Sequence, residues 1–330
     1  MKTIDIVCPV FREEESIALF HEALAAAIGS YGPEYQFRIR YVLDPWPDRT
    51  EDLLRSISAS DDRVEVVVMS RRFGHQAALV AGMDLSSADA IIMLDSDLQH
   101  PPSLLPELIS AWESGADIVQ AVRRDPRDSS AFKRLTSRWF YQAFLKLSGT
   151  NLQIGAADYR LVSSRVAKLF RDDIKEHNPF LRGLVGWVGF RIEYVPFVPA
   201  ARSHGRSKYR VSTLINFALN GICSFSKLPL RWCVTVGLIL SFVSVLLGIA
   251  QVLVYSFGVL QVPGWASLFS AISFIGGIQL FFLGVLGEYI GMIFDEVKGR
   301  PRYIVDRHKK AATTHDQRSG QAEFELPRSQ

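Results

Sequence analysis

The chain has 330 residues, with 37 Lys and Arg against 34 Asp and Glu and a net charge of +3. Hydrophobic residues make up 48% of it, and the mean hydropathy is +0.12. This length allows one α/β domain of about 200 residues plus a further segment. The small net charge excludes an electrostatic case for nucleic-acid binding, and three cysteines without metal-like spacing exclude a disulfide framework.

Strand and helix patterns alternate through the first 115 residues. Strands are expected at residues 3–11, 35–43, 63–70 and 88–95, and helices at 13–29, 49–59 and 74–86. Repeated strand–helix–strand units predict a mainly parallel sheet with helices on both faces. Such sheets bind ligands beyond the carboxyl ends of their strands, so we expect a site at that edge.

An Asp-Ser-Asp motif follows the last of these strands. Asp95 and Asp97 come after the apolar run Ile91–Leu94, and alternate residues of an extended chain share a face. Two carboxylates at the end of a buried strand are costly unless a positive charge lies between them. Carboxylate oxygens suit Mg²⁺ or Mn²⁺, which also bind phosphate oxygens. Asp44 and Ser70 fall at other strand ends, so three strands bring polar groups to one edge.

The middle of the chain is less regular. A charged segment at 123–134 predicts a mobile loop, 135–149 a helix, 190–200 a strand and 201–210 a basic loop. Residues 211–226 have apolar positions at helical spacing, which fits a helix in the membrane interface or a core helix.

Two membrane-spanning helices are expected next, because no charged residue or His occurs from Trp232 to Gly287. The spans are Cys233–Phe257 and Ala266–Gly287. The alternative is a buried hairpin in a soluble core, but core helices seldom avoid charge on every face. Basic residues precede the first span and follow the second, and the amino terminus enters a strand without a signal-peptide pattern. We therefore expect a multi-pass protein of the inner (cytoplasmic) membrane, with the first domain and the carboxyl terminus in the cytoplasm.

This organisation predicts four parts. They are a cytoplasmic catalytic domain at 1–210, an interfacial amphipathic helix at 211–230, a transmembrane hairpin at 231–290, and a basic tail at 291–330 whose end is disordered.

Several motifs run in order through residues 4–305, among them "SRRFGHQAALVAGMD", "LDSDLQHPP", "GAADYRLVSSRV", "FLRGLVGWVGF" and "GRSKY". In these motifs the chain resembles the GT-A-fold, family 2 glycosyltransferases that load sugars onto polyprenyl phosphates. Dolichyl-phosphate mannose synthases and bactoprenol glucosyltransferases belong to this group. The resemblance implies an α/β fold in which a GT-A (Rossmann-like, mainly parallel) catalytic domain precedes two transmembrane helices.

The resemblance also implies roles at matching positions. Nucleotide-sugar contacts are implied for Pro9, Glu13, Asp44, Gly74 and Asp95. A cluster for Mg²⁺ or Mn²⁺ is implied for Asp95, Asp97 and Gln99. Contacts with the acceptor phosphate are implied for Arg124, Lys133, Arg134, Arg138 and Lys208. Catalytic roles fall to Asp97 and Asp158, and His75 and His100 receive no chemistry.

Some of these residues also have a structural interpretation. Glu13 could favour a helix start through the helix dipole. Arg134 and Arg138 could form a solvated helix face. Asp158 could orient sugar hydroxyls or act as a base, and we favour the first because a polyprenyl phosphate is already anionic and needs placement more than deprotonation.

One stretch departs from the family pattern. Where the family commonly has Asp-Asp-Gly-Ser, this chain has Leu43, Asp44 and then Pro-Trp-Pro. The two prolines predict a stiff loop. Trp46 could stack on a base or sugar or could pack, so the identity of the donor nucleotide stays open.

The favoured function is inverting transfer of one hexose from a nucleotide-sugar, with UDP-glucose preferred, to undecaprenyl phosphate. One alternative is a GDP-mannose-dependent mannose synthase, and another is a catalytically silent nucleotide-sugar-binding membrane scaffold. A processive polysaccharide synthase is disfavoured, because Leu228 replaces the glutamine of its Q-x-x-R-W motif and two spans are too few for a channel. Expected partners are the lipid bilayer and further copies of the chain, with a tetramer as the candidate assembly, and no nucleic acid.

Overall fold

The computed structural model describes residues 1–123, 153, 155–177, 179–198, 226–256 and 264–309. Its described strands form an eight-stranded sheet in the order β7-β5-β6-β4-β1-β2-β3-β8. The strands are β1 (Lys2–Val10), β2 (Tyr35–Leu43), β3 (Val64–Met69), β4 (Ala90–Met93), β5 (Ile118–Arg123), β6 (Ala156–Ser163), β7 (Ile192–Phe197) and β8 (Val305–Lys309). Four of the seven pairings are parallel, which confirms the mainly parallel sheet.

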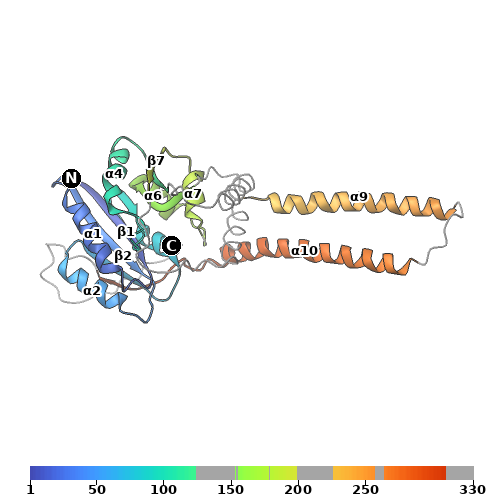
Figure 1. The fold of residues 1–330 in the computed structure, drawn as a ribbon, viewed down its shortest axis with the longest axis horizontal. Coiled ribbons are helices and arrows are strands. Elements are labelled where there is room, and N and C mark those ends of the chain that lie inside the picture. The colour runs from blue at the N-terminus through green and yellow to red at the C-terminus, as the bar shows by residue number, and fades with distance from the viewer. Residues whose placement is uncertain (124–152, 154, 178, 199–225, 257–263, 310–330) are drawn as a thin grey trace.

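Helices cover both faces of this sheet (Figure 1). They are α1 (Ile17–Gly29), α2 (Thr50–Ser60), α3 (His75–Asp84), the 3₁₀ turn η1 (Pro102–Leu104), α4 (Leu105–Glu113), α6 (Ser164–Asp172), α7 (Leu181–Trp187), α9 (Leu228–Ser256) and α10 (Trp265–Lys298). Helices α1, α2 and α4 pack into one buried cluster, and α3, α6 and α7 pack into a second. Successive residues of β1 alternate between the clusters: Ile6 and Cys8 belong to the first and Val7 to the second.

The strand and helix pattern expected for residues 1–115 is confirmed, with one displaced helix start. Helix α1 begins at Ile17 and not at Glu13. The backbone carbonyl of Glu13 accepts hydrogen bonds from the N–H groups of Ser16 and Ile17, which forms a turn first. Arg12 enters this turn with φ of 60°, a value that side-chain-bearing residues rarely adopt.

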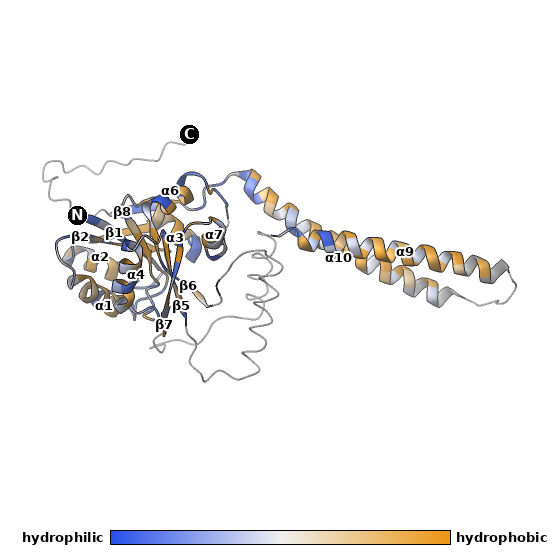
Figure 2. Ribbon diagram, turned by 90° about the horizontal axis from the view of Figure 1, so that it is seen from above, coloured by the Kyte–Doolittle hydropathy of each residue, from blue (hydrophilic) through white to orange (hydrophobic). Residues whose placement is uncertain are grey.

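Helices α9 and α10 form a hairpin that extends from the domain (Figure 1). Leu228–Ala250 and Ser270–Lys298 are long and apolar enough to cross a membrane, and their side chains are not buried within the chain. Figure 2 shows hydrophobic residues around the length of both helices. Helix α10 continues beyond the expected end at Gly287 to Lys298, where Gly299, with φ of 59°, terminates it.

The segment after α10 returns to the sheet, a feature that the sequence did not predict. Strand β8 pairs antiparallel with β3, and the N–H of Ser70 donates to the Ile304 carbonyl at 2.9 Å. The Tyr303 hydroxyl donates to Asp84 at the end of α3 at 3.1 Å. Arg307 pairs with Glu51 of α2 at 2.9 Å. The first part of the basic tail is therefore bonded to the domain.

Several expected elements lie outside the described residues. They are the loop at 124–134, the helix at 135–149, the basic loop at 201–210, residues 211–225 of the interfacial helix expected at 211–230, and the tail from residue 310.

Candidate active site

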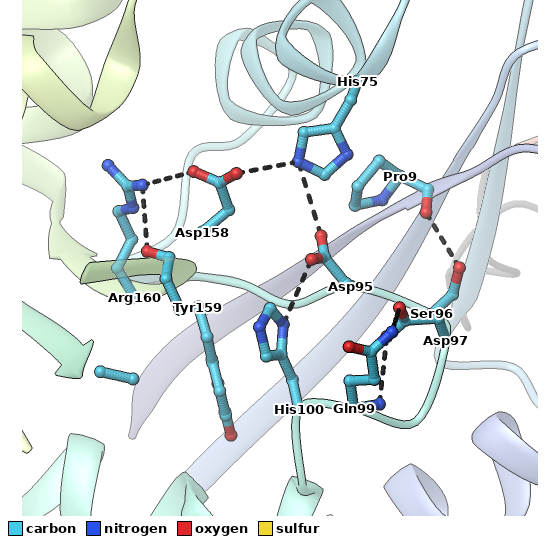
Figure 3. A network of polar contacts seen from close by, with 12 residues as sticks. Pro9, His75, Asp95, Ser96, Asp97, Gln99, His100, Asp158, Tyr159 and Arg160 are labelled. Carbon is cyan, nitrogen blue, oxygen red and sulfur yellow. Dashed lines mark hydrogen bonds and ion pairs between the residues drawn. The ribbon is translucent and has the colours of Figure 1, made fainter. Parts of the chain in front are cut away.

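Polar side chains from several elements meet at one edge of the sheet (Figure 3). Asp95 follows the carboxyl end of β4, while Asp158 lies near the amino end of β6. These ends adjoin because β4 and β6 run antiparallel, with Met93 opposite Arg160. His75 reaches the same place from the start of α3, so three elements supply the centre of the site.

Asp95 lies between two histidines. Its Oδ1 is 3.5 Å from His75 Nε2, and its Oδ2 is 3.3 Å from His100 Nδ1. His100 is itself held by ring contacts with Tyr159 and Phe197 at centroid distances of 5.4 and 5.6 Å. The pKa of Asp95 is raised above its ordinary value. Burial and the nearby carboxylates of Asp158 and Asp97 raise it by more than the two histidines lower it. The two histidines therefore do not fully compensate the negative charge of the Asp95 carboxylate.

The loop after Asp95 is fixed by local hydrogen bonds. Asp97 accepts from the Gln99 N–H at 3.0 Å and from the Gln99 amide Nε2 at 2.5 Å. The Ser96 hydroxyl donates to the carbonyl of Pro9 at 3.0 Å, which ties the loop to the end of β1. Leu98 has φ of 61°, a strained value of the kind that clusters at functional sites. Asp97 and Gln99 therefore act as one unit beside Asp95.

Asp158 is surrounded by cationic donors. Arg182 donates to both of its oxygens, from Nε at 3.0 Å and from Nη2 at 2.7 Å, and Arg160 adds a bond of 2.7 Å. His75 Nε2 lies 3.4 Å from Oδ2. Burial alone would raise the pKa of Asp158, but His75 and the two arginines hold it well below its usual range. A carboxylate in this environment accepts a proton poorly, which disfavours a role as general base.

Asp44 holds the loop that leads into α3. The residue is 3% exposed, and its carboxylate accepts hydrogen bonds from the backbone N–H groups of Phe73 and Gly74, each at 2.9 Å. Gly74 has φ of 99°, where a side chain would be strained. Asp44 therefore positions His75, which follows Gly74 in the chain. This role adds to the nucleoside contact that the resemblance implies for Asp44.

Glu13, for which the resemblance implies a contact with the nucleotide-sugar, lies in the turn after β1. The Glu13 carboxylate accepts a hydrogen bond from Ser16 Oγ, and the backbone N–H of Glu13 donates to Thr50 Oγ1 at 3.1 Å. Trp46 packs edge-on against Phe11 at 5.6 Å, and the Arg12 guanidinium lies 5.0 Å from its ring centre. Trp46 is still 44% exposed, so packing uses only part of its surface.

The residues expected to contact the acceptor phosphate lie outside the described part of the chain. They are Arg124, Lys133, Arg134, Arg138 and Lys208.

Four residues that received no role from the sequence complete the centre: His75, His100, Arg160 and Arg182. One signal was available, since Asp158 and Arg160 alternate along a strand and so share a face. No sequence signal places Arg182 or His75 beside them, because both come from other elements.

The residues present suit a divalent cation. Among the described residues, no three His, Cys, Asp or Glu side chains converge as a ready metal cage. Mg²⁺ is commonly held by one or two carboxylates together with substrate phosphates, and such a site needs no cage. Asp95 Oδ1 is buried without a hydrogen-bond donor in the described structure, and Asp97 and Gln99 adjoin it. This donor set fits the cation that the resemblance implies.

Comparisons with known proteins identify the family of this chain. The model of the family "Glycosyl transferase family 2" matches residues 5–170, and that of "GtrB C-terminal hairpin" matches residues 228–293. The chain is 39% identical over 307 residues to the SfII prophage-derived bactoprenol glucosyl transferase of Shigella flexneri, covering 92% of this chain and 97% of that one. It is 38% identical over 307 residues to a prophage bactoprenol glucosyl transferase homolog of Escherichia coli K12, covering 93% and 99%.

One solved structure to which part of this chain is similar is glucosyl-3-phosphoglycerate synthase from Mycobacterium tuberculosis in complex with Mn²⁺, UDP and phosphoglyceric acid. It is 20% identical, with a TM-score of 0.45, and the match covers 67% of this chain and 76% of that chain.

Proposed function

The chain belongs to glycosyl transferase family 2, and from this premise we propose that it transfers one hexose from a nucleotide-sugar to a polyprenyl phosphate. The proposed donor is UDP-glucose and the proposed acceptor is undecaprenyl phosphate. The relatives named bactoprenol glucosyl transferase support both the sugar and the lipid.

One observation carries the proposal: the same chain combines a carboxylate-centred site at the sheet edge with a long apolar hairpin. A soluble acceptor would not require the hairpin, whereas a polyprenyl chain resides in a bilayer. The similarity to the named relatives extends over both parts, since it covers more than nine-tenths of the chain.

In this proposal Asp95, Asp97 and Gln99 hold Mg²⁺ or Mn²⁺, which when bound neutralises the diphosphate of the donor. Pro9, Glu13, Asp44 and Gly74 form the nucleoside side of the site. Asp158 remains ionised between its arginines and orients the hydroxyl groups of the hexose. Asp158 takes no proton from the acceptor.

The acceptor needs no base, because its phosphate is anionic at neutral pH. One of its oxygens forms a bond to the anomeric carbon while the bond from that carbon to the donor diphosphate breaks. The leaving nucleoside diphosphate takes the electron pair, and the configuration inverts. The protein contributes placement and a preorganised charge distribution, and the basic residues Arg124, Lys133, Arg134, Arg138 and Lys208 are the proposed acceptor contacts.

We also propose that α9 and α10 cross the inner membrane, with the domain at 1–210 and the tail at 291–330 in the cytoplasm and the helix at 211–230 in the interface. Assembly as a homo-oligomer, with a tetramer as the candidate, stays a prediction that cross-linking in membranes would test.

A donor panel tests the proposal. Purified protein in detergent receives undecaprenyl phosphate, Mn²⁺ or Mg²⁺, and separately UDP-glucose, UDP-galactose, UDP-N-acetylglucosamine or GDP-mannose. We expect lipid-dependent release of UDP from UDP-glucose alone, and its loss in Asp97→Ala. Transfer from GDP-mannose would instead identify a mannose synthase, and binding of a donor without turnover would identify a scaffold.

A further inference from the structure

His75 occupies a position that the proposed reaction does not yet use. It is the first residue of α3, and the preceding Gly74 and Phe73 are bonded through their N–H groups to the Asp44 carboxylate. Its side chain is 40% exposed and points into the site between Asp95 and Asp158 (Figure 3). The chain therefore fixes the backbone of His75 while leaving its imidazole open to the site.

A single nitrogen of this imidazole faces both carboxylates. His75 Nε2 lies 3.5 Å from Asp95 Oδ1 and 3.4 Å from Asp158 Oδ2. One ring nitrogen carries at most one hydrogen, so it cannot give a full hydrogen bond to both oxygens at once. Both distances exceed the 2.7–3.2 Å of a typical N–H···O bond, as expected of a shared donor.

The two carboxylates differ in what else holds them. Asp158 also accepts hydrogen bonds from Arg160 and Arg182, which hold its carboxylate in place. Asp95 has the second histidine, His100, and among the described residues its buried Oδ1 has no donor at normal hydrogen-bond length, since His75 Nε2 is 3.5 Å away. Asp95 is thus the partner that a bound ligand would change.

We propose that His75 is a positioning residue that couples the diphosphate side of the site to the sugar side. Once a cation and the donor diphosphate engage Asp95, that carboxylate no longer competes for the Nε2 hydrogen. His75 then donates fully to Asp158 Oδ2, which adds a fourth hydrogen bond to that carboxylate and fixes its position beside the hexose. Hydrogen-bond partners that orient metal-binding side chains commonly contribute about 10–100-fold to affinity or activity, and we expect an effect of this order from His75 on the sugar-side carboxylate.

This inference rests on the proposed function and deepens it, because it assigns the coupling between two parts of one donor site. It predicts that His75 strengthens binding of the sugar part of the donor and does not strengthen binding of the nucleotide part. A residue that only starts α3 would affect both alike.

Isothermal titration tests the inference with UDP and with UDP-glucose, each with Mn²⁺ and without acceptor. The variants are His75→Ala, His75→Gln, whose amide can still donate to Asp158, and His100→Gln, which touches Asp95 but is not in contact with Asp158. Thermal midpoints are compared first, and we expect the two His75 variants to stay within about 2 °C of the wild type because the side chain is partly exposed.

For His75→Ala we expect the affinity for UDP to change less than about twofold, while the extra affinity for UDP-glucose and kcat each fall about tenfold or more. His75→Gln should recover most of both. In His100→Gln the affinities for UDP and UDP-glucose should change together.

Equal weakening of UDP and UDP-glucose by His75→Ala, or an unchanged kcat, would overturn the inference while leaving the proposed function intact. A wild-type protein that binds and transfers no glucose from UDP-glucose would overturn the proposed donor and this inference with it. If His75→Ala does not fold, the same comparison is made with His75→Asn, whose shorter amide should fail to reach Asp158 and should resemble the expected alanine result.

Discussion

Replacing Asp158 by asparagine separates an anchoring carboxylate from a catalytic base. The Asp158 side chain is 6% exposed and accepts three hydrogen bonds from Arg160 and Arg182, whose side chains are 0% and 33% exposed. Asparagine keeps the shape but removes the charge, so two guanidinium groups are left without their shared anion. Removal of one partner from a buried ion pair costs about 3–5 kcal/mol.

The partial exposure of Arg182 places the expected loss near the lower end, about 3 kcal/mol. For a domain of this size each kcal/mol lowers the thermal midpoint by about 2–4 °C, so Asp158→Asn should melt about 6–12 °C lower. Intrinsic fluorescence on heating measures this in detergent. The double variant Asp158→Asn with Arg182→Gln should lose less than the sum of the single variants, because one unpaired cation is removed.

The same variant should lose sugar transfer, but the pH–rate profile of the wild type should show no limb from Asp158 near neutral pH, since its pKa lies far below. An asparagine variant with an unchanged midpoint and abolished transfer would refute the anchoring role and support a base.

Three further outcomes follow from the structure. Burial raises the pKa of Glu65, but the His308 imidazole 3.7 Å away and the nearby Arg40 and Arg38 lower it from 4.5 to about 2. Stability from Glu65 is therefore complete above about pH 4.5 and is lost as the pH falls through 2, by about 3 kcal/mol in total. Thermal midpoints at pH 7, 5 and 3 should fall less steeply in Glu65→Gln, and identical slopes would contradict this. Tyr303→Phe removes one hydrogen bond to Asp84 and should cost about 1 kcal/mol, or 2–4 °C; an unchanged midpoint would mean that the segment after α10 is not held as described. Asp97→Ala should abolish the strengthening of UDP binding by Mn²⁺ in calorimetry, and retained strengthening would remove Asp97 from the cation site.

The sequence pattern predicted those strands and helices whose formation depends on residues close together in the chain. The strand at residues 35–43 was predicted at its observed bounds because its apolar and aromatic residues alternate with Gln36, Arg38 and Arg40. The start of α1 was misplaced by four residues, because the turn after Arg12 depends on backbone bonds that composition does not reveal. Strand β8 was missed because its charged residues resemble a tail, and its partner β3 is more than 200 residues away.

The candidate site shows the same division. Asp95 and Asp97 could be singled out, because a pair of carboxylates after an apolar strand has few structural explanations. The contacts of Asp158 with Arg182 and His75 could not, since they depend on β6, α7 and α3 meeting at one edge. The resemblance named Asp158 but not the charges that keep it ionised.

The most direct test of the central claim compares two acceptors that differ only in the terminal phosphate group. Purified protein is given labelled UDP-glucose with Mn²⁺ and either undecaprenyl phosphate or undecaprenol, and label is counted in the organic phase. The proposed function predicts glucose transfer to the phosphate alone, with a β-linked product by NMR. Equal transfer to undecaprenol, or release of UDP that does not depend on the lipid, would contradict it.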